Sequence, residues 1–126
     1  MSVLTQPPVM GDVLKYELNP NFTRETVTLL AGTKYPVGAV LGRITASGKL
    51  KLSTATGSDG AQTVAGVLLY ATDATAADMP GVILARGPAL VSKAALLFDA
   101  SVDDAAKTAA KHAQLTALGI IPRDTA

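Results

Sequence analysis

A single histidine, His112, is the first residue in this chain to examine for catalytic chemistry, because any Ser-His-Asp arrangement would have to use it. His112 follows Lys111 in an alanine-rich segment of helical character, three residues before Leu115. A catalytic site needs a cleft and an orienting acid as well as a base. We therefore interpret His112 as a solvated residue on a helix face, and we expect no catalytic residue.

Three further groups of polar residues could carry chemistry, and each has a simpler structural explanation. Ser92-Lys93 is not a catalytic dyad if it lies in a strand, because adjacent side chains then point to opposite faces. The stretch 57–60, Gly-Ser-Asp-Gly, lacks the frame of a phosphate-binding loop and is interpreted as a turn. A third group contains acidic residues without the spacing of a calcium loop, and it comprises Asp99, Asp103 and Asp104. We expect neither a metal nor a cofactor.

Arg86 is a charged residue at the end of an apolar segment, just before Gly87-Pro88. Two interpretations stay open for it. The side chain either forms a structural salt bridge or an interface contact, or it is an edge-strand charge that discourages wrong pairing.

Short strands separated by glycine turns must position these side chains. Alternation and β-branched residues predict strands, and glycine or proline marks the turns between them. The predicted strands are 25–30, 37–45, 49–53, 64–70 and 82–86, with 89–98 ambiguous between helix and strand. The clearest hairpin joins 37–45 to 49–53 through a tight turn. Five apolar residues of these strands are expected in the core: Leu50, Leu52, Val67, Leu69 and Ile83.

One helix is predicted near the C-terminus, over about 101–118. Ser101 is its expected N-cap, Asp103 and Lys107 form an i,i+4 pair, and Gly119 follows as the C-terminal cap. The residues that share its expected packing face are Val102, Ala106, Ala109, Ala113 and Ala117.

Residues 1 to about 21 are predicted to form a flexible N-terminal arm, because proline, glycine and asparagine interrupt this segment too often for a stable element. Residues 22–126 then form a single β-rich domain. Within the arm, the segment 13–18 has strand-forming character, which suits pairing with the edge of another protein's sheet.

Composition excludes several classes of function. The chain has 126 residues, 11 basic against 10 acidic side chains and no cysteine, so thiolate metal sites and disulfides are excluded. No basic stripe or aromatic platform indicates nucleic-acid binding. No segment is long and apolar enough to cross a membrane, and no signal peptide is visible. Apolar residues reach 48% and charged residues only 17%, which favours an interface and oligomerisation.

Ordered segments from residue 22 to 123 resemble the head decoration protein family of lambda-like tailed phages. The resemblance runs through 22–33 (FTRETVTLLAGT), 35–44 (YPVGAVLGRI), 58–62 (SDGAQ), 65–70 (AGVLLY), 82–89 (VILARGPA) and 118–123 (LGIIPR). Each segment by itself is only a strand with glycine, but their ordered combination is specific.

The resemblance implies a mostly β fold of the β-tulip type with short irregular strands. It also implies a homotrimer bound to the major capsid protein at local three-fold sites outside the expanded capsid, where it stabilises the shell against internal DNA pressure. The protein would be made in the bacterial host cytoplasm. The arm is expected to order on the capsid, with Val13, Leu14, Tyr16 and Leu18 as the capsid-binding residues. The alternatives are another multimeric virion or adaptor module, a small β-barrel hydrolase using His112, and a carbohydrate-binding module.

Overall fold

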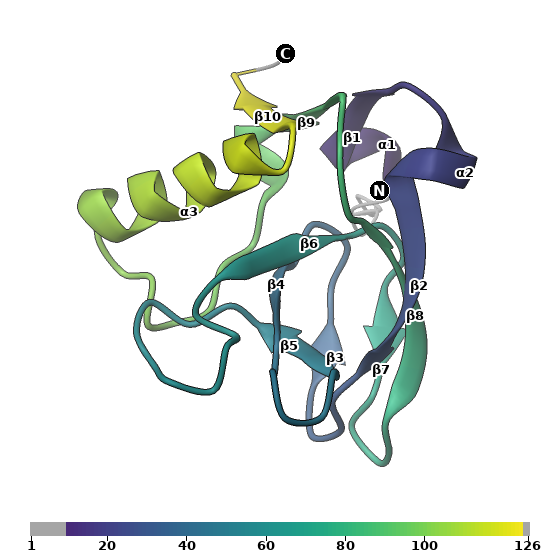
Figure 1. Cartoon of the computed structure of the whole chain (residues 1–126), viewed down its shortest axis with the longest axis vertical. Coiled ribbons are helices and arrows are strands. Elements are labelled where there is room, and N and C mark those ends of the chain that lie inside the picture. The colour runs from purple at the N-terminus through teal and green to yellow at the C-terminus, as the bar shows by residue number, and fades with distance from the viewer. Residues whose placement is uncertain (1–9, 125–126) are drawn as a thin grey trace, which may run out of the picture.

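The computed structural model describes residues 10–124 of the chain (Figure 1). Its helices are α1 (Met10–Val13), α2 (Pro20–Thr23), the 3₁₀ turn η1 (Lys93–Ala95) and α3 (Ala105–Ala117). Its strands are β1 (Leu14–Glu17), β2 (Arg24–Leu29), β3 (Lys34–Tyr35), β4 (Val40–Arg43), β5 (Leu50–Leu52), β6 (Val64–Leu68), β7 (Thr72–Asp73), β8 (Met79–Leu84), β9 (Ala89–Ser92) and β10 (Ile120–Arg123). The mostly β class with a C-terminal helix is confirmed.

Five strands close into a small barrel in the order β2-β5-β4-β6-β8. The predicted hairpin is confirmed as β4 and β5, which pair antiparallel with Leu41 opposite Leu52 and Arg43 opposite Leu50. The longest pairing joins β2 to β8. The barrel closes where β2 and β5 run parallel, with Leu29 opposite Leu50. Above the barrel, a second sheet has the order β1-β9-β10, and α3 lies beside it (Figure 1).

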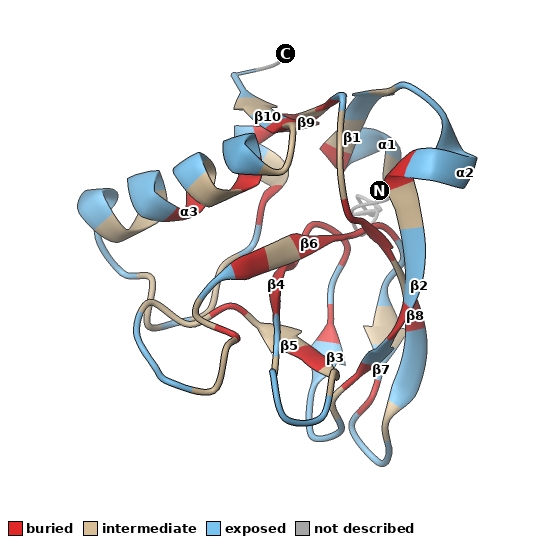
Figure 2. Cartoon of the chain, viewed as in Figure 1, coloured by how far each residue is buried: buried red, intermediate tan, exposed pale blue. Residues whose placement is uncertain are grey.

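Two hydrophobic cores share the barrel strands. Along β4, β6 and β8, neighbouring side chains point alternately into the barrel and toward the upper sheet, because side chains alternate along a strand. In β6, Val67 belongs to the upper core and Leu68 to the barrel core. A strand buried on both faces reads as a continuous apolar run, which is the pattern of 64–70 in the sequence. Figure 2 shows these strands as largely buried.

The five predicted core residues agree well with the structure. Leu50, Val67, Leu69 and Ile83 are fully buried. Leu52 is half-buried and packs against the barrel core from the end of β5. The ambiguous stretch 89–98 divides into a strand, β9, and the short turn η1.

The helix α3 begins later than expected and presents a different face. Asp104, not Ser101, is its N-cap, and the Asp104 side chain accepts a hydrogen bond from the Lys107 amide at 2.8 Å. Ser101 instead bonds to Asp99 and accepts from the Ala55 amide, which ties it to a loop rather than to the helix. The predicted pair of Asp103 and Lys107 is confirmed at 2.9 Å.

The expected alanine face of α3 points to solvent. Its four alanines, Ala106, Ala109, Ala113 and Ala117, are all exposed, whereas Lys111 and Leu115 are buried. Leu115 buries far more apolar surface than any alanine, so the helix turns that side toward the core. Alanine still suits the outer face, because it has the highest helix propensity of any residue.

The polar residues of α3 attach the helix to the barrel. The Lys111 ammonium donates to Ser53 Oγ at 2.9 Å and to the carbonyl oxygens of Thr54 and Gln62, each at 2.6 Å. Gln114 Oε1 accepts from the Val64 amide at 2.8 Å, at the start of β6. These bonds satisfy all three ammonium protons of a side chain that is almost fully buried.

The residues that follow α3 cross the segment that precedes β9, and glycines allow the two backbones to approach closely. Gly119 follows the helix with φ +85°, and a Cβ added at Gly87 would lie 1.8 Å from the Gly119 carbonyl oxygen. The Gly87 amide donates to the Leu118 carbonyl at 2.9 Å. Leu118 is the C-cap, and Gly119, the expected cap, follows it at the next position with positive φ. The crossing leads directly into the parallel pairing of β10 with β9.

We predict that Leu50→Ala lowers the free energy of unfolding by about 2–5 kcal/mol, because the fully buried side chain leaves a cavity at the point of barrel closure. Leu52→Ala should cost clearly less, because Leu52 is only half-buried. Urea denaturation followed by circular dichroism measures both. Equal losses for the two variants would contradict the assigned burial of β5.

Candidate functional site

The four residues expected to bind a partner occupy two different environments. Val13 is completely buried in the upper core, and Leu14 is half-buried against the same core, with Val91 opposite it in β9. Tyr16 is 49% exposed and Leu18 is 58% exposed. Only the latter two are therefore open to a partner in this conformation.

The described part of the expected arm contains regular structure that packs on the body. Residues 10–17 form α1 and β1, and β1 pairs antiparallel with β9. Residues 10–17 pack on the body because the Val13 side chain completes the upper core and removes apolar surface from water. Residues 1–9 of the expected arm lie outside the described residues.

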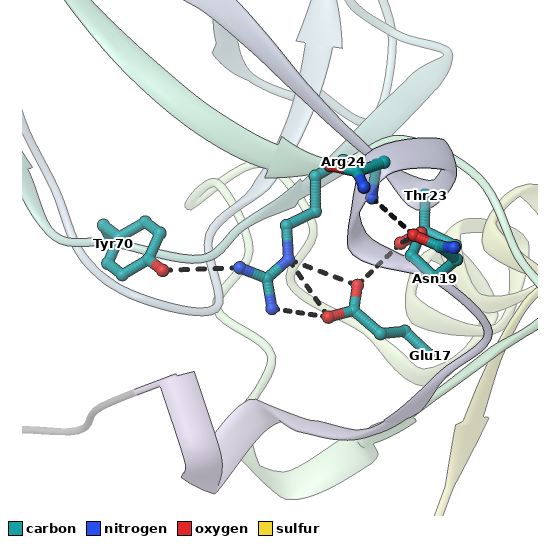
Figure 3. A network of polar contacts seen from close by, with 6 residues as sticks. Glu17, Asn19, Thr23, Arg24 and Tyr70 are labelled. Carbon is teal, nitrogen blue, oxygen red and sulfur yellow. Dashed lines mark hydrogen bonds and ion pairs between the residues drawn. The ribbon is translucent and has the colours of Figure 1, made fainter.

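A partly buried ion pair fixes the conformation between β1 and β2. Arg24 donates through Nε and Nη2 to the Glu17 carboxylate, and Thr23 Oγ1 donates to Glu17 Oε2 at 2.6 Å. Figure 3 shows the Arg24 guanidinium between the Glu17 carboxylate and the Tyr70 hydroxyl, to which Arg24 Nη1 donates at 3.4 Å. The Glu17 and Arg24 side chains are 10% and 21% exposed, so the pair is largely withdrawn from water.

The pKa of Glu17 reflects this environment. Burial by itself would raise that pKa, but the hydrogen bonds from Arg24 and Thr23 outweigh burial and hold the pKa below its usual value. Glu17 in turn raises the pKa of Arg24. Both groups are therefore charged at neutral pH and satisfy each other.

A short helix, α2, presents the exposed residues beside this pair. Asn19 is its N-cap and accepts from the Asn21 amide at 2.9 Å, and Pro20 follows in the first turn. This helix was not expected from the sequence. Asn-Pro, with the cap residue followed by proline at the first helical position, is the local signal that predicts it. Phe22, in the same turn, is exposed.

Hydrogen bonds connect α2 and the residue before its cap to the segment between β8 and β9. The Thr23 carbonyl accepts from the Ala85 amide at 2.8 Å, and the Leu18 amide donates to the Pro88 carbonyl at 3.1 Å. Arg86 pairs with Glu25 at 2.7 Å, bonds to the Phe22 carbonyl and lies 5.5 Å from the centre of the Phe22 ring. Of the two interpretations of Arg86, the structure supports the salt bridge.

The other candidate residues do not assemble a reactive centre. Ser92 is buried at the end of β9, whereas Lys93 is exposed and begins η1. Asp59, in the turn 57–60, pairs with Lys51 at 2.7 Å. Within residues 10–124, no three acidic or histidine side chains are grouped closely enough to hold a metal ion. His112 is not the solvated residue we expected, because it is half-buried and packs against Phe98.

The comparison with protein families decides what kind of protein this is. The profile of the bacteriophage lambda head decoration protein D matches residues 3–120. The chain belongs to this family. No match was found among curated proteins. The predicted resemblance is thereby confirmed.

Membership of the head decoration family assigns this chain a structural role in the phage capsid. The family is a class of capsid proteins and not a class of enzymes. It also implies association with the phage capsid and a place on the capsid exterior. No helix within the described part of the chain is long and apolar enough to cross a membrane.

We predict that Glu17→Gln lowers the free energy of unfolding by about 1–3 kcal/mol at pH 7, because it leaves the largely buried Arg24 without its counter-charge. The pKa of Glu17 is lowered in the folded state, so its stabilising effect is present above pH 4.5 and is lost as the pH falls through the lowered pKa. The variant should therefore lose less stability on acidification below pH 4.5 than the unmodified protein.

Thermal denaturation at pH 7, 4.5 and 3 tests this expectation. Glu25→Gln is the matched control, because its pair with Arg86 is more than a third exposed and should contribute only about 0–1 kcal/mol. Equal effects of the two substitutions would show that the Glu17 pair has no special importance.

Proposed function

We propose that this protein binds the outside of the expanded phage capsid as a homotrimer at local three-fold sites, contacts the major capsid protein and stabilises the shell against internal DNA pressure. Family membership is the observation that carries the proposal. The low proportion of charged residues and the exposed large apolar side chains support a protein that functions within an assembly.

We further propose that the N-terminal segment, residues 1–21, supplies capsid contacts. Among the four residues first considered, Tyr16 and Leu18 are the two whose side chains are exposed in the free chain. Val13 and Leu14 instead hold the segment on the body, so their contribution is to position the other two. Aromatic and large aliphatic side chains are common anchors at protein interfaces.

The charges beside these residues favour their burial at an interface. Glu17 and Arg24 already bond to each other, so a partner that covers this region leaves no unpaired charge. β1 is moreover an edge strand, because β9 occupies only one of its sides in the sheet order β1-β9-β10. An edge strand offers backbone groups to an added strand of a partner.

We predict that the double substitution Tyr16→Glu and Leu18→Glu weakens binding to expanded heads that lack the decoration protein by tenfold or more. Losing the burial of one large apolar side chain costs about 1.5–3 kcal/mol, and each 1.4 kcal/mol is about a factor of ten in affinity. Sedimentation of the heads followed by quantification of bound copies measures the effect.

Met79→Glu is the matched control for this experiment, because Met79 is also an exposed apolar residue but lies in β8, at the end paired with Leu29 of β2. The control should bind as the unmodified protein does, and all variants should keep their melting temperature. Undiminished binding by the double variant would eliminate Tyr16 and Leu18 as capsid contacts.

The folded position of Val13 changes how a deletion must be designed. Removal of residues 2–18 would take away β1 and the buried Val13 side chain, so reduced binding could reflect damage to the body. Removal of residues 2–9 leaves every described element intact. This shorter deletion therefore tests the first part of the segment separately from Tyr16 and Leu18.

The proposed trimer has its own test. Light scattering coupled to size exclusion at tens of micromolar should give about three times the chain mass of 12.8 kDa. The apparent mass should fall on dilution if the trimer is weak, because assembly depends on concentration. A mass of 12.8 kDa at every concentration, together with normal decoration of heads, would restrict trimer formation to the capsid surface.

A further inference from the structure

His112 is a residue of α3 to which the proposed function assigns no role. Its ring packs against Phe98, with 5.8 Å between the ring centres and a tilt of 58° between the planes. Its Nε2 atom is buried, and no group in residues 10–124 forms a hydrogen bond with it. His112 is the only histidine in the chain.

The two protonation states of His112 have different requirements. A neutral imidazole carries one N–H, and the proton can reside on Nδ1, which leaves Nε2 as an unused acceptor. The imidazolium carries a proton on both nitrogens, so Nε2 becomes a charged donor in a buried position without an acceptor. An unsatisfied charged donor costs more than an unsatisfied neutral acceptor. The packing around Nε2 therefore favours the neutral ring.

Charged groups around α3 act on the same equilibrium. Burial lowers the pKa of His112, the positive charge of Lys93 in η1 lowers it further, and Asp124 beyond β10 acts in the opposite direction. On α3 itself, the neighbouring Lys111 is directed away, toward Ser53, Thr54 and Gln62. The sum of these effects is a pKa below the usual value for histidine.

We propose that His112 is a pH-sensitive switch. The neutral ring holds α3 against the segment containing Phe98, and protonation of the ring loosens the helix. Because the unfolded chain binds this proton more readily than the folded one, stability is fully present above pH 6.5. It falls as the pH decreases from 6.5 toward the lowered pKa. Over that window the ratio of unfolded to folded protein should rise by up to about tenfold per pH unit.

The carboxyl groups with lowered pKa values do not interfere with a measurement between pH 7.5 and 5.5. Carboxyl groups held at lowered pKa values change their charge below their usual range, well under pH 5.5. These groups belong to Glu17, Asp59, Asp73, Asp78 and Asp103. A change in stability between pH 7.5 and 5.5 that depends on residue 112 can thus be assigned to its imidazole.

The test compares the full-length protein with two variants that cannot titrate at this position. His112→Phe keeps an aromatic ring against Phe98, and His112→Gln serves if the phenylalanine variant does not fold. NMR titration of the ring protons gives the pKa of His112. Melting temperatures at pH 7.5, 6.5 and 5.5, with amide exchange corrected for intrinsic rates, report global stability and the protection of residues 105–117.

We expect a His112 pKa below 6.5, a melting temperature that falls with pH only in the unmodified protein, and a loss of amide protection at pH 5.5 that is larger in α3 than in the β2–β8 pair. Lys93→Gln should raise the pKa of His112, whereas Lys107→Gln should not, because the Lys107 ammonium pairs with Asp103 and does not act on His112. The proposal is overturned by a pKa of 6.5 or more, by variants that keep the pH dependence, or by protection lost equally throughout the chain.

Discussion

The position of the C-terminal third of this protein depends on one buried ammonium group. Lys111 extends from α3 into the loop between β5 and β6, where its ammonium bonds to Ser53 Oγ and to the carbonyl oxygens of Thr54 and Gln62. Burial lowers the pKa of Lys111, with Asp99 opposing the shift, so desolvation of the amine is a cost that these three acceptors offset. These hydrogen bonds are directional, so the three acceptors hold the ammonium in one position. The apolar contacts of Leu115 are not directional and by themselves would allow α3 to slide along the barrel.

The arrangement of the sheet β1-β9-β10 depends on this position of α3. α3 leads through Gly119 into β10, β10 pairs with β9, and β9 pairs with β1. The N-terminal strand is thus held by a sheet whose other edge is set by the helix. The segment bearing Tyr16 and Leu18 is therefore presented in a defined conformation, and the Glu17–Arg24 pair fixes the turn that follows it (Figure 3).

The two-core arrangement also explains the unusual composition. Strands β4, β6 and β8 bury both faces, so they have few positions for charged side chains, and the whole chain carries only 17% charged residues. The hydrophobic composition therefore has two sources, an interior with two cores and a surface with exposed apolar residues such as Tyr16, Leu18 and Phe22. Only the second source bears on assembly, and only the structure separates the two.

The sequence by itself determined the features that depend on neighbouring residues. Alternation predicted the β4–β5 hairpin, and the i,i+4 spacing predicted the pair of Asp103 and Lys107. The glycine at 119 predicted the end of the helix to within one residue of the observed cap, Leu118. The ordered segments from 22 to 123 also identified the family, because their order along the chain is itself information in the sequence.

Tertiary structure alone decided which surfaces meet. Proline and glycine near Val13 predict an irregular arm, yet Val13 is buried in the upper core. That core forms between elements that are far apart in the chain, so the local sequence does not predict it. The alanines of α3 face outward and Lys111 is buried because the acceptors for its ammonium come from residues 53–62, which lie 49 to 58 residues away in sequence. Local patterns fix hydrogen bonds within a few residues, but burial depends on surfaces that distant segments supply only after the chain has folded.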